Sequence, residues 1–437
     1  ITRIHVQECL RVARVRPPTP ELTSDAMPCA LGYFRKDDGS YVIIKAQRTP
    51  EGHPQLLYLL VPDIALRWLG GNYRLFESLG YEEMRTFDAP RPNLPPLMLE
   101  EPQVLPDEDQ IELIYDLFYY CGDNVKNVEG ILAALIHSQP ITILNSPLSL
   151  QQRMGFIQGM LCLLPTPARV GITWMTHSDR SDNTLAQITF IYGDSYKNVG
   201  VIYDWDAGQL LTEAPQDKYS RYIASQMRLD ASLVLENTRS IARTAVWRAM
   251  RQESLPDALH FASRRAAIDS AVSNNQPADR ETVAAILRQD PTLSDDMRLL
   301  YARHLLAFTI ALRDGLEYSE VLPIVAAADR PVAEMIYQQL REVAEGENPL
   351  QVIDIVERWM VNIPQAKVIP WYQIAHMAVM NYLESTLRDG NTTEAIDFLS
   401  RIQNMHRALQ MENVVPQLIN IAQGSAAFDV NLAQAIF

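Results

Sequence analysis

Residues 129–204 limit the possible fold most, because helical and strand-like patterns alternate along them. An apolar helical pattern at 129–137 leads through Pro140 into a strand-like run at 141–145. A second helical pattern at 149–164 precedes three further strand-like segments, at 170–176, 185–192 and 199–204. Strands that alternate with helices are typical of α/β folds. We therefore predict an α/β core, which extends over residues 107–216.

Residues 1–89 carry the pattern of a small antiparallel sheet. Strand-like runs at 30–35 and 40–45 flank the segment Asp37-Asp38-Gly39, and Gly favours a hairpin turn because it adopts positive φ without strain. A third strand-like run follows at 55–61. Residues 90–106 contain six prolines, which predict an extended linker between this sheet and the α/β core.

Residues 217–437 show helical patterns only. Asn348-Pro349 is a typical helix start, and Gly390 and Gly424 follow helical segments as typical stop residues. No strict repeat of about 33 or 34 residues is present. The predicted fold class is an α+β N-terminal region, with a small antiparallel sheet and an α/β core, followed by an all-α, irregular, solenoid-like helical domain.

The chain lacks the short motifs that identify common catalytic or nucleotide-binding sites. It contains no P-loop and no G-x-G-x-x-G sequence. The motifs of serine hydrolases, zinc peptidases and kinases are also missing. The four cysteines include no C-x-x-C pair, so we expect buried thiols rather than a zinc site or a disulfide. We expect a protein without enzymatic activity, cofactor or bound metal.

Charge and hydropathy limit the partners and the location. The formal net charge of −15 argues against a general nucleic-acid-coating role, because displacing counterions requires a surplus of Lys and Arg. No apolar run approaches the roughly 20 residues that span a bilayer. Residues 1–16 lack the apolar region of a signal peptide. We therefore expect a cytoplasmic protein that has no membrane span. We expect its partner to be another protein rather than a nucleic acid.

One polar run, residues 176–183, offers candidate site residues between two predicted strands. His177, Asp179 and Asp182 combine an imidazole with carboxylates, which can ligate a metal or transfer protons near neutral pH. The same Ser, Asp and Asn residues are also typical of a solvated hairpin loop. Three ligands on one loop rarely hold a metal without a fourth from elsewhere. We therefore favour a solvated hairpin loop over a metal or proton-transfer site. We expect His177, Asp179 and Asp182 to form part of an interaction surface.

A second candidate surface is basic. Arg239, Arg243 and Arg251 fall in one helical segment, and we expect them to share a helix face. Such a face can bind an acidic partner or a nucleic-acid backbone. It can equally be a solvated face on which the arginines pair with Glu236 and Glu253.

An aromatic strip lies in the helical segment that opens the α/β core. Its members are Tyr115, Phe118, Tyr119 and Tyr120. Aromatic residues at helical spacing usually form the buried side of an amphipathic helix. We therefore expect this strip to pack into the core.

Two short passages carry a family resemblance. The first joins ILAALI to PITIL at residues 131–144, and the second joins MLCLLP to ARVGITW at residues 160–174. Together with the preceding sheet, they resemble bacterial GTPase-associated proteins with a longin-like and a DENN-like module, over about residues 30–204. The resemblance implies a longin-like sheet in residues 1–89, a DENN-like core in 107–216, and a small GTPase or related NTPase as partner. It assigns no role to any single residue.

These observations lead to one expected function and two alternatives. We expect a non-enzymatic adaptor or regulator that binds an NTPase, for example a small GTPase, or scaffolds a multiprotein assembly. The first alternative is a small-ligand sensor or enzyme with a site at the carboxyl ends of the core strands, around Asn145, Ser146 and the His177 loop. The second is a nucleic-acid-binding subunit of a defence complex, which would use the arginines.

Overall fold

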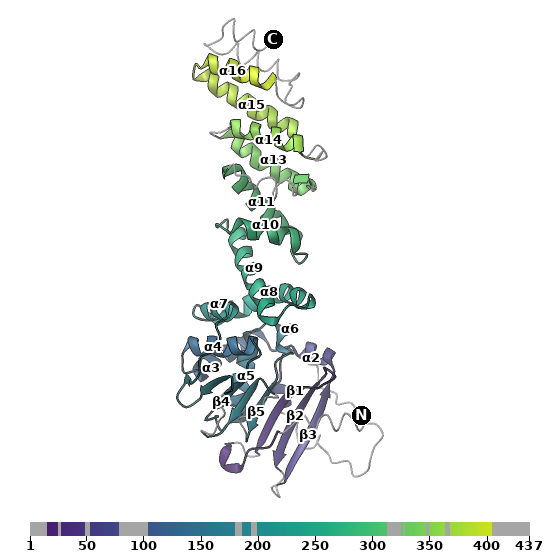
Figure 1. Cartoon of the computed structure of the whole chain (residues 1–437), viewed down its shortest axis with the longest axis vertical. Helices are drawn as coiled ribbons and strands as arrows, with labels where there is room; N and C mark the ends of the chain where they lie inside the picture. Colours follow the sequence, from purple (N-terminus) through teal and green to yellow (C-terminus); the bar gives the residue numbers. More distant parts are fainter. Residues whose placement is uncertain are drawn as a thin grey trace. The chain divides into compact units, whose positions relative to one another are not determined.

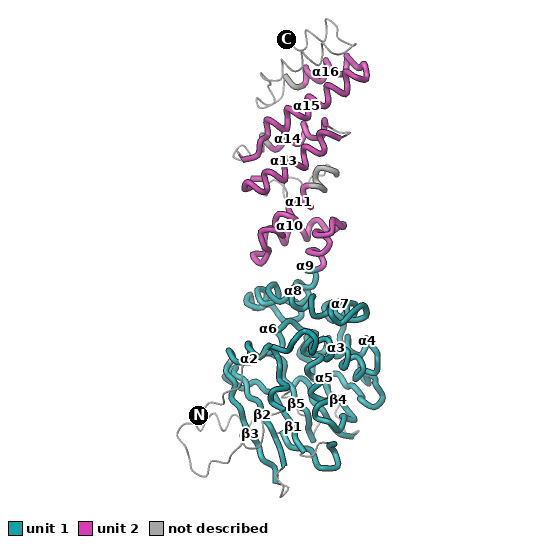
Figure 2. Tube along the Cα trace, turned by 180° about the vertical axis from the view of Figure 1, so that it is seen from behind, with its two compact units in different colours: residues 1–266 teal, residues 267–437 magenta. Residues whose placement is uncertain are grey.

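The computed structural model divides the chain into two compact units, residues 1–266 and residues 267–437 (Figure 2). Nearly all of the predicted linker, residues 90–103, lies outside the described residues. The structure describes residues 15–24, 28–48, 53–77, 104–179, 186–193, 199–312, 325–326, 328–346, 349–362 and 368–403.

The first unit is built on one mixed sheet of eight strands in the order β3-β2-β1-β5-β6-β4-β7-β8. Strands β1, β2 and β3 form an antiparallel meander, β5, β6, β4 and β7 run parallel, and β8 is antiparallel to β7. The strand bounds are β1 Cys29–Arg35, β2 Tyr41–Arg48, β3 Pro54–Val61, β4 Ile141–Leu144, β5 Trp174–Ser178, β6 Ile188–Ile191, β7 Val201–Asp204 and β8 Gln209–Leu210.

The two regions predicted as separate domains contribute to this one sheet. Strand β1 pairs antiparallel with β5, with Gly32 opposite Met175 and Tyr33 opposite Trp174. The predicted mixed N-terminal region followed by helices is therefore confirmed, but the sheet is larger than the small one expected. Sequence patterns identify the strands from β1 to β7 and miss the two-residue β8, and they carry little information on pairing between segments about 140 residues apart.

The predicted hairpin between the first two strands is confirmed. Gly39 has a φ of 84°, a conformation that only Gly adopts readily. Asp38 closes the turn, because its carboxylate accepts hydrogen bonds from the Ser40 backbone N–H and from the Lys36 ammonium, at 2.9 Å and 2.8 Å. These bonds lower the pKa of Asp38 well below its usual range.

Helices cover one face of the sheet and form the main core with it (Figure 1). The opposite face carries two smaller clusters, one around Phe34 and Ile44 and one around Leu144 and Ile202. The helix bounds in this unit are α2 Asp63–Leu69, α3 Asp107–Tyr120, α4 Val125–Ile136, α5 Leu150–Cys162, α6 Thr166–Arg169, α7 Lys218–Met227 and α8 Ala231–Met250.

Helices α3 and α5 approach each other closely at Gly159. An added Cβ there would lie 2.6 Å from the Leu113 carbonyl oxygen. Gly159 thus allows the two helices to pack backbone to backbone, and α5 is buried along almost its whole length.

The second unit contains helices only among its described residues, as predicted for this region. From α10 to α16 each described helix contacts the next one along the chain, α13 also packs on α15, and the helices from α11 onward share one apolar core. The helix bounds are α9 Leu255–Ser273, which crosses the unit boundary, α10 Arg280–Gln289, α11 Asp295–Leu312, α13 Arg330–Glu345, α14 Pro349–Asn362, α15 Trp371–Arg388 and α16 Thr392–Gln403.

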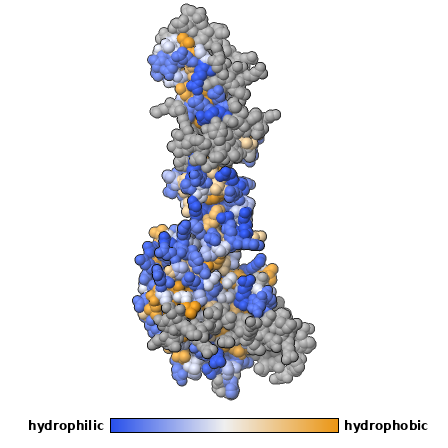
Figure 3. Space-filling model, viewed as in Figure 1, coloured by the Kyte–Doolittle hydropathy of each residue, from blue (hydrophilic) through white to orange (hydrophobic). Residues whose placement is uncertain are grey.

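In the part of the chain that the structure describes, no helix combines the length and the apolar character needed to cross a membrane. The coloured, described residues on the visible face are mostly hydrophilic, with apolar residues scattered among them (Figure 3).

Candidate functional site

The carboxyl ends of the four parallel strands lie along one edge of the sheet. This is the edge at which open α/β sheets bind ligands. Strand β5 ends at Ser178, β6 at Ile191, β4 at Leu144 and β7 at Asp204. The residues predicted around Asn145 and His177 therefore do lie on this edge, although on different strands.

His177 is a buried residue of β5, with only 2% of its surface exposed. Its Nε2 lies 3.1 Å from a carboxylate oxygen of Asp179, and its ring centroid lies 5.3 Å from that of Tyr192. Its Nδ1 has no hydrogen-bond partner among the described residues. Burial lowers the pKa of His177, the Asp179 carboxylate opposes this effect, and the nearby Arg153 adds to it. The imidazole is therefore neutral at pH 7.

The prediction of a solvated hairpin loop at His177 is wrong. Strand β5 continues through Thr176, His177 and Ser178, and the next strand, β6, runs parallel to it, so the connection cannot be a hairpin. The error arose because polar residues occupy the end of a buried strand. Asp182 lies outside the described residues. Within those residues, no group of three metal-ligating side chains was found.

Arg153 supports this part of the edge, and the sequence analysis missed it. It lies on α5, is fully buried, and donates a hydrogen bond of 3.0 Å to the Thr176 carbonyl oxygen of β5. Further bonds reach the carbonyl oxygens of Leu148 and Ser149. The guanidinium thus holds the start of α5 against β5. The sequence feature that could have identified Arg153 is a single arginine within the mostly apolar helical pattern at 149–164.

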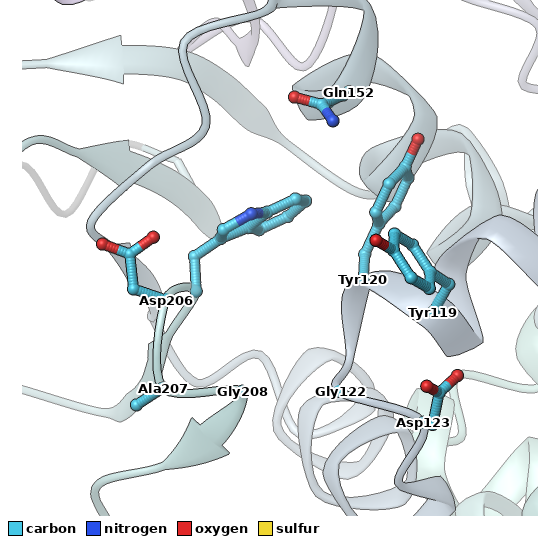
Figure 4. Close-up of a pocket in the computed structure, with 9 residues that line it drawn as sticks. Tyr119, Tyr120, Gly122, Asp123, Gln152, Asp206, Ala207 and Gly208 are labelled. Carbon is cyan, nitrogen blue, oxygen red and sulfur yellow. The ribbon is translucent and has the colours of Figure 1, made fainter.

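A cavity of about 380 Å³ opens at the end of β7 (Figure 4). We name it the tyrosine–tryptophan cavity. Its walls come from three segments: the end of α3 with the turn after it, the first turn of α5, and the turn between β7 and β8. The lining residues are Tyr119, Tyr120, Gly122, Asp123, Gln152, Trp205, Asp206, Ala207 and Gly208.

Aromatic packing fixes the Trp205 wall of the cavity. The Trp205 ring centroid lies 5.1 Å from that of Tyr120 and 5.8 Å from that of Phe156. Tyr120 in turn packs over Gly155 of α5, where an added Cβ would lie 3.3 Å from the tyrosine ring. Because these rings support one another, the cavity wall is preformed.

The floor of the cavity depends on a contact between two backbone turns. Gly122 has a φ of 67°, and an added Cβ there would lie 2.8 Å from the Gly208 carbonyl oxygen. The Asn127 amide joins the same two turns, because it donates to the carbonyl oxygens of Cys121 and Gly208 at 2.9 Å and 2.8 Å. Tyr203 adds a bond of 2.7 Å to the Tyr120 carbonyl oxygen.

Two carboxylates and no basic side chain are found among the residues that line the cavity. Tyr119, Tyr120 and Asp123 stand on one side, and Asp206 and Ala207 form the other rim (Figure 4). Burial, the Asp116 carboxylate and Tyr119 raise the pKa of Tyr120, and Arg74 opposes them. The Tyr120 hydroxyl therefore stays protonated at neutral pH.

The cavity corrects the prediction that the aromatic strip of α3 packs into the core. Tyr119 is 69% exposed and Tyr115 is 53% exposed, whereas Tyr120 is half-buried. The carboxyl end of α3 therefore presents aromatic surface to solvent. The sequence feature that could have indicated this exposed aromatic surface is the pair Tyr119-Tyr120, because Gly122 and Asp123 end the helix directly after it.

The three arginines do not form one face. With 3.6 residues per helical turn, Arg239 and Arg243 lie about 40° apart around α8, and Arg251 lies about 120° from Arg239. Arg251 is the residue that caps α8, and its guanidinium lies over the Trp247 ring at 5.3 Å. Arg243 is exposed.

Arg239 pairs with an acid other than the expected Glu236. Its guanidinium forms a bidentate ion pair with Asp107, at the start of α3. This contact raises the pKa of Arg239 and lowers that of Asp107. Arg239 therefore joins α8 to α3. Glu253 does pair with an arginine, but with Arg248, at 3.0 Å.

Arg169 lies in the second of the two passages that carry the family resemblance, residues 160–174, and it is a buried structural residue. Its guanidinium donates to the carbonyl oxygens of Leu164 and Gly70 and to the side-chain oxygen of Gln110, at 2.9 Å, 3.3 Å and 3.1 Å. Burial lowers the pKa of Arg169. Because its donors point at groups inside the protein, Arg169 does not form an external site.

Comparison with known proteins leaves the family open. No protein-family model matches the chain, and a search of curated proteins gives no significant match.

Proposed function

We propose that this chain is a non-enzymatic, cytoplasmic adaptor or regulator that binds an NTPase partner, for example a small GTPase. The observation that carries the proposal is the packing of the second unit. From α10 to α16 its described helices contact the next helix along the chain, and the helices from α11 onward bury apolar residues in one shared core. Arrays with this neighbour-to-neighbour packing commonly serve as scaffolds, because they leave long surfaces free for a partner. The solenoid-like character and the longin-like and DENN-like modules are part of this proposal.

Exposed apolar side chains on the first unit support a protein partner. Ile64 and Trp68 lie one turn apart on α2, and each is 58% exposed. A helix usually turns such residues toward the core. Trp is also among the residues that contribute most to protein interfaces. In the second unit, Tyr372 on α15 is 38% exposed and offers a comparable contact.

Affinity purification of the tagged full chain from its host, followed by mass spectrometry, tests the proposal. We expect one NTPase in near-stoichiometric amount. Trp68→Ala and Tyr372→Ala then show which unit holds the partner, because each removes exposed aromatic surface from only one unit. Tyr115→Ala, an exposed tyrosine on α3, is the matched control.

Two results would count against the proposal. A chain that purifies alone at moderate salt has no stable partner, and the adaptor function then fails. A partner that is retained equally by Trp68→Ala and Tyr372→Ala binds elsewhere, which removes the support from these two surfaces. Thermal melts of each variant show whether a loss of binding reflects unfolding.

A further inference from the structure

We propose that the tyrosine–tryptophan cavity is a binding site for an organic cation, such as a guanidinium or alkylammonium group. The proposal does not depend on the adaptor function. It rests on the size, the aromatic walls and the charge of the cavity.

The size of the cavity fits a small group. Ligand sites in proteins commonly measure about 300–1,000 Å³, and this cavity, at about 380 Å³, is near the lower limit. It therefore suits one polar head group with a short chain. It is too small to enclose a large cofactor.

The walls offer aromatic faces that attract cations. Tyr119, Tyr120 and Trp205 surround the space, and the electron-rich faces of Tyr and Trp rings bind ammonium and guanidinium groups. The rings of Tyr120 and Trp205 are fixed by their neighbours, as described above. Because the site is preformed, a ligand loses little free energy in ordering it.

The charge of the lining decides between a cation and an anion. Neutral aromatic walls alone would also accept a nucleobase, but a nucleotide would bring phosphates into a site lined by Asp123, Asp206 and no basic residue. Neither carboxylate takes part in an ion pair within the described part of the chain. Both negative charges therefore remain at the rim of the cavity, with the Asp206 side chain on the outer side of its turn (Figure 4).

The two helix ends at the cavity do not reverse this sign. The carboxyl end of α3 contributes about half a negative charge, and the first turn of α5, at Gln152, contributes about half a positive charge. These partial charges oppose each other. Arg74, whose positive charge acts on Tyr120, does not line the cavity, so the two carboxylates are the full charges of the lining. Along α3, Glu108, Asp109, Glu112 and Asp116 add further negative charge, whereas Asp107 is paired with Arg239.

Calorimetric titration of the full chain with matched probes tests the proposal. The cationic probes are N-acetylarginine amide and N-acetyltrimethyllysine amide. Their neutral counterparts are N-acetylcitrulline amide, which has nearly the same shape as the arginine probe, and N-acetylnorleucine amide. We expect at least one cation to bind about tenfold more tightly than its neutral counterpart, and the difference to shrink at high salt. If neither cation binds better than its counterpart, the proposal is wrong.

Variants locate the binding. Asp123→Asn, alone and with Asp206→Asn, removes charge with little change of shape, and Tyr119→Leu removes one exposed ring. We expect about tenfold weaker binding for the double variant and a smaller loss for Tyr119→Leu. Glu108→Gln and Tyr115→Leu are the controls, since both residues are exposed on α3 and neither lines the cavity. Unchanged binding in the cavity variants, with melts like the wild type, would place the cation elsewhere and overturn the proposal.

A third comparison identifies the source of the cation. A pentapeptide with a central arginine, Gly-Ser-Arg-Ser-Gly, is titrated beside the amino-acid amide. Equal affinity supports a free small cation as the ligand. A peptide that binds about tenfold more tightly supports an arginine side chain presented by a protein.

Discussion

Replacing Gly159 by Ala should destabilise the first unit, because Gly159 sets the distance between α3 and α5. The new Cβ would lie 2.6 Å from the Leu113 carbonyl oxygen and 2.7 Å from the Leu117 Cβ. Ordinary contacts begin near 3.4 Å, so the helices must separate by roughly 0.8 Å at this point. A backbone oxygen cannot rotate away as a side chain can.

The magnitude follows from two opposing contributions. Overpacking a core costs about 1–3 kcal/mol, and the upper end applies because the contact is with backbone. Ala in a helix interior regains about 1 kcal/mol relative to Gly. The expected net loss is about 2 kcal/mol of unfolding free energy. For a unit of this size, that corresponds to a melting temperature lower by about 4–8 °C.

Scanning calorimetry of the full chain measures this shift in the transition assigned to the first unit. Gly171→Ala is the control, since Gly171 is exposed and the nearest atom to its added Cβ is the Ala168 oxygen, at 3.6 Å. Gly155→Ala should fall between the two, because its neighbour is the Tyr120 ring, at 3.3 Å. A Gly159→Ala protein that melts at or above the wild-type temperature would refute the reasoning.

Three further predictions concern ionisable groups. Burial lowers the pKa of His177 below about 6.5, so as the pH falls the unfolded chain takes up a proton at this residue before the folded chain does. The wild type should therefore lose stability relative to His177→Gln below about pH 6.5, by at most about 1.4 kcal/mol per pH unit. Urea titrations measure this difference, and parallel pH profiles of the two proteins would contradict it. A double-mutant cycle on Asp107 and Arg239 should show a small coupling that disappears near 1 M salt, since both side chains are about half exposed; an undiminished coupling would show that solvent does not reach the pair. Burial raises the pKa of the Cys121 and Cys162 thiols, so iodoacetamide should alkylate both residues in urea but neither in the native protein. Peptide-resolved mass spectrometry measures this, and rapid alkylation of the native protein would mean that the thiols are accessible.

Local structure was predictable where local physics decides it. The hairpin at Gly39 follows from turn chemistry between neighbouring residues, and the helix that starts at Asp107 has three acidic residues in its first turn, where they suit the helix dipole. The strand expected at 170–176 begins only at Trp174, because α6 and the turn after it occupy residues 166–171. Its carboxyl end was misassigned because Thr176, His177 and Ser178 are polar but buried.

The candidate site was less predictable than the elements that form it. The tyrosine–tryptophan cavity combines residues near 120, 152 and 206, and only the tertiary fold brings these segments together. The ion pair of Arg239 with Asp107 spans 132 positions in sequence. Helical periodicity indicates which residues share a face, but not which distant group packs against that face. This is why Glu236, a neighbour in sequence, was the expected partner.

The pairing of β1 with β5 has a practical consequence for dividing the chain. A fragment that ends in the proline-rich stretch after the third strand would keep the meander but lose the partner of β1. The complementary fragment would expose β5 in the same way. Unpaired strand edges recruit other strands and promote aggregation, so both fragments should be poorly soluble. Co-expressing the two halves should restore the sheet, whereas a fragment comprising residues 1–266 keeps every strand pair intact.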